Sequence, residues 1–167
     1  MTIESEGFAA MKSTFSEWLG RLRAARPRSD KRTATSATSV LLAGSGDDDV
    51  ASLRGILEHS RWTLVHATTW TAALGAQQES GFPIVLYDRD LSGVPWHEGV
   101  RLMMRAGHPP AVILLSNVAD PYLWDKVVQA GGFDVLTRPF RREETLAMLD
   151  FAYTHWRTSW VQKPASA

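Results

Sequence analysis

Three polar residues of different chemistry each end a short apolar run in this chain. Asp88 follows Ile84–Tyr87, Ser116 follows the run AVILL, and Arg138 follows the run VLT. In a sheet of parallel strands the carboxyl ends share one edge, where the ligand crevice of such sheets lies. The pattern therefore predicts an acid, a hydroxyl and a guanidinium at one rim. The chemistry of the chain depends on what the Asp88 carboxylate meets there.

These runs belong to a regular alternation of strands and helices that begins near residue 40. The expected strands cover 40–43, 62–67, 84–87, 111–115 and 133–137, and the expected helices cover 48–59, 69–79, 96–106, 120–130 and 142–160. A short apolar run bounded by glycine and proline is typical of a strand buried on both faces, and such strands are parallel with helices above and below. The alternation predicts an α/β fold of the flavodoxin-like type, a doubly wound five-stranded parallel sheet in the order 2-1-3-4-5.

Composition and charge restrict the class of protein. The chain has 167 residues, of which 44% are hydrophobic and 22% charged, as expected for one globular domain with appendages. Its 18 basic residues balance 18 acidic ones, so no overall charge attracts it to nucleic acid or anionic membranes. The lack of cysteine excludes disulfides and thiolate metal sites. The sequence also lacks a long apolar run of the kind that would indicate a signal peptide or a membrane span. We expect a cytoplasmic protein that contacts neither membrane nor nucleic acid.

The N-terminal part of the chain differs in composition from the rest. We predict an amphipathic helix and a basic segment within 1–32, a linker at 33–38, the main domain at 39–162 and a tail at 163–167. The helix carries a heptad stripe of Phe8, Met11, Phe15, Trp18 and Leu22. This stripe either covers the chain's own core or binds a partner or a second copy. The basic run at 21–32 is either a solvated segment or a contact for phosphates or acidic lipid.

The last expected helix, 142–160, carries a second apolar stripe that ends in Tyr153, Trp156 and Trp160. Its length exceeds what one side of a small sheet needs. We predict that these aromatic residues and the N-terminal stripe bind a partner, or pair two chains as a homodimer through the terminal helices.

The stretch GGFDVLTRPF at 131–140 resembles the end of the receiver domain of two-component response regulators. Ser116 follows Asp88 by 28 residues and Arg138 follows Ser116 by 22, a spacing similar to that of the family. The resemblance covers residues 40 to about 155. It implies that Asp88 accepts a phosphoryl group, that Ser116 binds the phosphoryl oxygens, and that Arg138 stands where the family has a lysine. It also implies a histidine kinase as a partner.

Phosphoryl transfer to Asp88 also needs a divalent metal, because a carboxylate and a phosphoryl donor are both anionic. Magnesium takes oxygen ligands, including one or two carboxylates. Receivers have an acidic pair at the end of the first strand, whereas here that strand ends in AGSG and the acids follow. Either Asp47 or Asp48 folds back to bind Mg²⁺ with Asp88 and the backbone carbonyl of Asp90, or these acids cap the next helix and the metal site is lost.

Further departures indicate an atypical, degenerate receiver. The planar guanidinium of Arg138 replaces a lysine and is suited to a permanent ion pair with Asp88. Val135 stands where many receivers place a switching aromatic residue, and Ser92 stands where the family has proline. We therefore expect a stand-alone signalling protein that is not an enzyme, lacks an output domain and acts through protein–protein interaction, with weak or no phosphorylation at Asp88. The alternative is a functional phosphoacceptor that takes a phosphoryl group from a histidine kinase with Mg²⁺.

Overall fold

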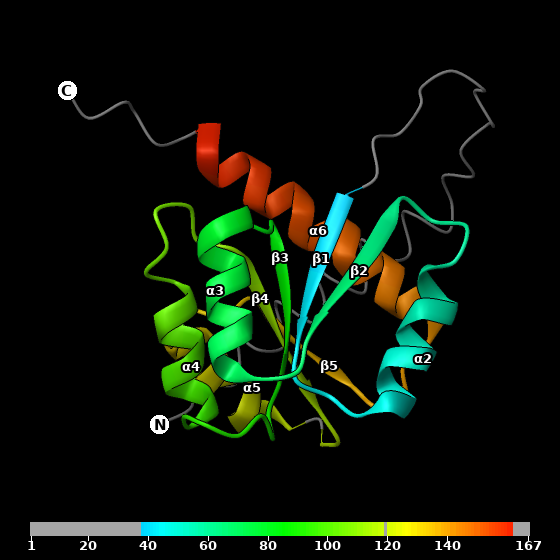
Figure 1. Cartoon of the computed structure of the whole chain (residues 1–167), viewed down its shortest axis with the longest axis horizontal. Coiled ribbons are helices and arrows are strands. Elements are labelled where there is room, and N and C mark those ends of the chain that lie inside the picture. The colour runs from blue at the N-terminus through cyan, green and yellow to red at the C-terminus, as the bar shows by residue number, and fades with distance from the viewer. Residues whose placement is uncertain (1–37, 119, 162–167) are drawn as a thin grey trace, which may run out of the picture. The chain divides into compact units, whose positions relative to one another are not determined.

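The computed structural model describes residues 38–118 and 120–161, which form a five-stranded parallel sheet covered by helices (Figure 1). The strands are β1 (Thr38–Ala43), β2 (Trp62–Ala67), β3 (Ile84–Asp88), β4 (Ala111–Ser116) and β5 (Asp134–Thr137). They pair in the order β2-β1-β3-β4-β5, and every pair is parallel. The predicted flavodoxin-like sheet is confirmed. The predicted N-terminal helix, its stripe and the tail lie outside the described residues, so the domain boundaries stay predictions.

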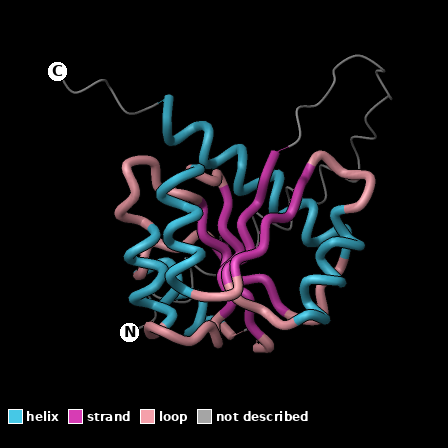
Figure 2. Tube along the Cα trace, viewed as in Figure 1, coloured by secondary structure: helices cyan, strands magenta, loops and turns pink. Residues whose placement is uncertain are grey.

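The helices lie in two layers, one on each face of the sheet. They are α2 (Asp47–Leu57), α3 (Trp70–Ser80), α4 (Trp96–Met103), α5 (Pro121–Gln129) and α6 (Arg142–Val161). The first layer holds α3, α4 and α5, and the second holds α2 and α6 (Figures 1 and 2). None of the helices in the described ranges is long and apolar enough to cross a membrane.

The core explains why the strands have continuous apolar sequences. Every residue of β3 and β4 is buried, because helices cover both faces of the sheet. Successive side chains of a strand point to opposite faces. The core beneath α3, α4 and α5 includes Leu41, Val85, Tyr87, Val100 and Val127. On the other face, α2 and α6 bury Leu53 and Leu149.

The register of the strands brings the predicted site residues to one edge. Asp88 pairs with Leu115, and Ser116 pairs with Thr137, which directly precedes Arg138. The amide of Arg138 also donates a hydrogen bond of 3.0 Å to the carbonyl oxygen of Ser116. The acid, the hydroxyl and the guanidinium therefore come from adjacent strand ends.

The start of α2 corrects one expectation. The prediction that Asp47 or Asp48 caps this helix is wrong, because the N-cap is Gly46, which has no side chain that could cap it. Residues 47–49 instead fill the first turn. Carboxylates there still favour the helix, since they face the positive end of its dipole.

Candidate functional site

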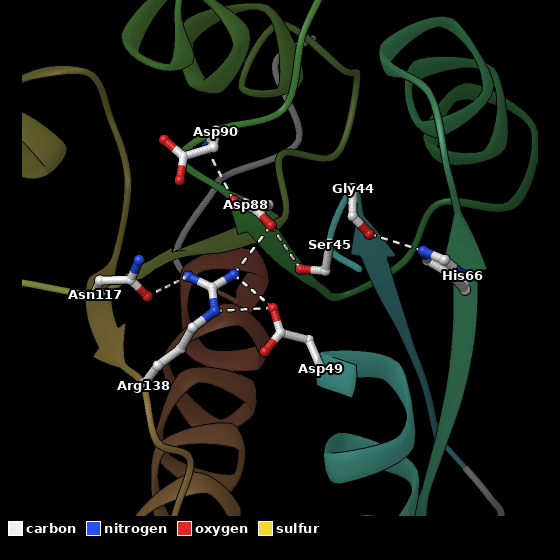
Figure 3. Close-up of polar contacts among 8 residues, drawn as sticks. All are labelled: Gly44, Ser45, Asp49, His66, Asp88, Asp90, Asn117 and Arg138. Atoms are coloured by element: carbon white, nitrogen blue, oxygen red, sulfur yellow. Dashed lines mark hydrogen bonds and ion pairs between the residues drawn. The ribbon is translucent and has the colours of Figure 1, made fainter. Parts of the chain in front are cut away.

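The Asp88 carboxylate lies at the end of β3, and both of its oxygens accept hydrogen bonds. The side chain is 9% exposed. Its Oδ1 accepts a hydrogen bond of 2.9 Å from the amide of Asp90. Its Oδ2 accepts one of 2.9 Å from Ser45 Oγ and one of 3.0 Å from Arg138 Nη2 (Figure 3). Both oxygens therefore have partners, and one partner carries a full positive charge.

The guanidinium of Arg138 joins Asp88 to a second carboxylate, that of Asp49. Nε and Nη2 of Arg138 lie 2.8 and 2.7 Å from Asp49 Oδ2 (Figure 3). The side chains of Arg138 and Asp49 are 19% and 21% exposed, so solvent reaches this pair only in part. Burial lowers the pKa of Arg138, but its hydrogen bond to Asp49 and the surrounding carboxylate charges outweigh burial and raise that pKa above its ordinary value. Arg138 is thus a fixed cation shared by two acids.

The loop after β1 closes one side of the site. Its first residues, Gly44 and Ser45, have φ angles of +86° and +72°. A Cβ at Gly44 would lie 3.0 Å from Asp88 Cβ, so only glycine allows the loop to approach this closely. His66 Nε2 donates to the carbonyl oxygen of Gly44 over 2.7 Å and ties the loop to β2. The loop is shaped to bring the Ser45 hydroxyl to Asp88.

Ser116 shares the strand edge, but its hydroxyl serves a local turn. The residue is 1% exposed, and its Oγ accepts a hydrogen bond of 3.1 Å from the amide of Val118. The next residue, Asn117, lies at the rim, where its Oδ1 is 3.5 Å from Arg138 Nη1. The structure therefore brings Asp88 and Arg138 into direct contact, with Ser116 beside them at the end of the adjacent strand.

The acids predicted as metal ligands do not gather around Asp88. Asp47 and Asp48 are exposed on the first turn of α2, and Asp90 is also exposed, although its amide contacts Asp88. The acid that does enter the site is Asp49. Within residues 38–118 and 120–161, no group of three or more His, Cys, Asp or Glu side chains is placed to hold a metal ion.

Sequence reasoning did not identify Ser45 or Asp49 as partners of the site. The GSG turn at 44–46 was a signal for a sharp loop, but nothing in it showed that Ser45 points to Asp88. Asp49 is the last of three consecutive acids. Which of the three points to Arg138 depends on the residue at which α2 begins, and helix ends predicted from sequence are uncertain by one or two residues.

Tyr87, next to Asp88 in β3, is fully buried on the face beneath α3, α4 and α5. Burial, and secondarily the charge of Asp88, raises the pKa of Tyr87 to about 12. Its ring lies edge-on to Trp70, and its hydroxyl lies against Gly99 of α4. The side chain forms part of the core immediately beneath the site.

The aromatic end of α6 packs partly on its own domain. The Tyr153 ring stacks on Trp156 at 5.8 Å and meets Trp62 edge-on at 5.7 Å. Trp156 also stacks on His108 at 4.2 Å. Beside it, at the amino ends of β4 and β5, lies a cavity of about 320 Å³. Tyr153 and Trp156 are half-buried, whereas the side chain of Trp160 lies outside the described part of the chain.

Comparison with known proteins relates this fold to signalling domains. No family model matches the sequence, and no curated protein matches it. Among solved structures, the signal receiver domain of an HD domain-containing protein from Pseudomonas fluorescens Pf-5 has a TM-score of 0.69 at 21% identity, covering 80% of this chain and 99% of that one. The signal receiver domain of a putative Luxo repressor protein from Vibrio parahaemolyticus has a TM-score of 0.68 at 15% identity, with coverages of 75% and 98%.

A third similar structure is the chemotaxis response regulator CheY4 of Vibrio cholerae, with a TM-score of 0.62 at 18% identity, covering 69% of this chain and 98% of that one. At such identities the similarity describes the fold. The part of this chain that the structure describes has the fold of a CheY-like receiver domain of response regulators.

Proposed function

We propose that this chain is a receiver-fold signalling protein that acts by binding other proteins, without catalysing a reaction and without phosphoryl transfer to Asp88. The observation that carries this proposal is the double contact of Arg138 Nη2 with Asp49 and Asp88. It leaves the predicted phosphoacceptor ion-paired and hydrogen-bonded.

To act as a nucleophile, the Asp88 carboxylate would attack phosphorus through a free lone pair that is aligned with the donor. Here Oδ1 of Asp88 is held by a backbone amide, and Oδ2 is held by both Ser45 and Arg138. Hydrogen bonds to a charged group are stronger than those between neutral groups, so the two contacts of Oδ2 hold the carboxylate in place and lower its reactivity. We take this arrangement as that of a pocket that does not switch by phosphorylation.

For the binding surface, we propose the aromatic end of α6 together with the N-terminal stripe of Phe8, Met11, Phe15, Trp18 and Leu22. Tyr153 and Trp156 remain half-buried, and Trp156 lines the cavity at the amino ends of β4 and β5. Half-buried aromatic rings are frequent anchors of protein interfaces. The partner is another signalling protein or a second copy of the chain, in the cytoplasm.

The alternative function is a working phosphoacceptor that takes its phosphoryl group from a histidine kinase with Mg²⁺. The observation that favours it is the position of Asp88 at the carboxyl edge of the sheet, with Ser116 at the end of the adjacent strand. This function would require Arg138 to release Asp88 during the reaction.

Chemical phosphorylation separates the two functions. The purified chain is incubated with acetyl phosphate or carbamoyl phosphate and Mg²⁺, and the intact mass is recorded. We expect no added phosphoryl group. A mass gain that Asp88→Asn abolishes and Asp90→Asn preserves would overturn the proposal, because Asp90 is a neighbouring exposed acid.

A second measurement tests the surface. Light scattering compares the full chain with a chain that lacks residues 1–30 and with Trp156→Ala. We expect both changes to alter the number of chains per assembly, while Tyr122→Ala, on the exposed surface of α5, leaves it unchanged. The same number of chains in all four proteins would contradict pairing through the terminal helices.

A further inference from the structure

The point where the carboxylates of Asp49 and Asp88 converge is occupied by the protein itself. Nη2 of Arg138 lies 2.7 Å from Asp49 Oδ2 and 3.0 Å from Asp88 Oδ2 (Figure 3). We propose that the guanidinium of Arg138 is the built-in cation of this pocket, that it excludes a divalent metal from the space between the two acids, and that its removal creates a metal site. This goes beyond the proposed function, because it concerns metal binding.

The guanidinium of Arg138 fills the space that a metal ion would need. Magnesium binds carboxylate oxygens at about 2.0–2.1 Å and requires near-octahedral geometry, so it must sit where those oxygens converge. In this chain that place holds a planar group fixed by three contacts shorter than or equal to 3.0 Å, from Nε and Nη2 to Asp49 and from Nη2 to Asp88. The residues present do not fit a metal ion while the guanidinium stays.

The guanidinium of Arg138 also brings a permanent positive charge to this point. A lysine is a single point charge on a flexible chain, whereas arginine keeps its charge and binds carboxylates through a planar fork. Arg138 cannot lose its positive charge by losing a proton, and this charge offsets one of the two carboxylate charges. The acids therefore attract a metal ion less strongly than they would without Arg138.

No third carboxylate of the described residues contacts the point between Asp49 and Asp88. Asp47, Asp48 and Asp90 are exposed and do not contact Asp88 through their carboxylates among the described residues. Ser45 uses its hydroxyl as a donor to the same oxygen that Arg138 contacts. The only carboxylates that converge within the described site are those that Arg138 already binds.

The test uses Mn²⁺ as a paramagnetic probe on the isotope-labelled full chain, observed by NMR. In the wild type we expect no selective broadening of the amide signals of Gly44, Asp49 and Asp88. In Arg138→Ala we expect selective broadening of these signals and binding of Mn²⁺ tighter by about tenfold or more. Adding Asp49→Asn to Arg138→Ala should remove most of that gain, whereas adding Asp48→Asn should preserve it.

Several results would overturn the inference. One is a wild type that binds Mn²⁺ at Asp88 as tightly as Arg138→Ala does. Another is a folded Arg138→Ala protein without any gain; if this variant does not fold, Arg138→Gln, which is neutral and similar in size, is used in its place. The mass measurement with acetyl phosphate separates the two proposals. Mn²⁺ bound at Asp88 of a wild type that gains no phosphoryl group would overturn the built-in cation and leave the proposed function standing.

Discussion

Ser45 donates its hydroxyl to Asp88 Oδ2 over 2.9 Å from a backbone with a φ of +72°. The left-handed region costs a residue with a side chain about 1–2 kcal/mol, and a hydrogen bond to a charged group contributes about 1.5–3 kcal/mol. The bond to Asp88 is large enough to offset the backbone cost. The loop conformation and the state of the Asp88 carboxylate are therefore coupled.

The first prediction separates the cost of the Ser45 backbone conformation from the gain of its hydrogen bond to Asp88. Ser45→Ala loses the hydrogen bond but keeps the unfavourable φ, so we expect a loss of about 1–3 kcal/mol in the free energy of unfolding. Ser45→Gly loses the same bond but relieves the backbone, and we expect it to be more stable than Ser45→Ala by about 1 kcal/mol. Urea unfolding measures both values. Equal stability of the two variants would mean that the left-handed conformation is not retained.

The second prediction concerns the acidic turn of α2. Asp49→Asn removes the charge that Arg138 binds, and we expect a loss of about 1–2 kcal/mol because the pair is only about one-fifth exposed. Asp48→Asn is the matched control, since it makes the same change one residue earlier at an exposed position. Both lose a charge near the helix N-terminus, so their difference isolates the contact with Arg138. If Asp48→Asn lowers the free energy of unfolding as much as Asp49→Asn does, the ion pair with Arg138 does not stabilise the fold.

The fold was predictable from sequence because its strands are short apolar runs separated by clear turn residues. In a doubly wound sheet these runs leave few possible topologies, and the strand ends then place Asp88 and Arg138 at one edge. The register confirms that placement, through the pairing of Ser116 with Thr137 and the contact between Arg138 and Asp88. The roles of these residues in phosphoryl transfer stay predictions.

The inner contacts of the site were not predictable to the same degree. Each step along a helix turns the side chain by about 100°, so an error of one residue in the start of α2 exchanges Asp48 for Asp49. The positive φ of Ser45 depends on close packing of Gly44 against Asp88, which is a tertiary contact. Likewise, Trp156 stacks on His108, a residue from a distant turn, and helical spacing alone does not show this tertiary contact.

The third prediction compares two glycines in helices. Gly99 of α4 lies against the Tyr87 hydroxyl, so the methyl group of Gly99→Ala would overlap that side chain. We expect this variant to lose about 1–3 kcal/mol of stability. Gly75 of α3 has no atom within 4 Å of an added Cβ, and Gly75→Ala should gain about 0.5–1 kcal/mol through helix propensity. Thermal unfolding followed by circular dichroism measures both, and a stabilising Gly99→Ala would contradict the packing of Tyr87 against α4.

The last prediction is a pH dependence caused by Tyr87. Its pKa is raised from 10.0 to about 12, so the folded chain retains the phenol proton where the unfolded chain loses it. The contribution of Tyr87 to the free energy of unfolding is fully present below about pH 10 and is lost as pH rises through about pH 12. The total loss is about 2–3 kcal/mol. Tyr87→Phe cannot ionise, so it should lack this loss. At neutral pH it should be as stable as the wild type or more so, because the hydroxyl has no hydrogen-bond partner among the described residues. Urea unfolding of both proteins near pH 9 and near pH 11 measures the difference; parallel curves would show that Tyr87 ionises as readily in the folded chain as in the unfolded one.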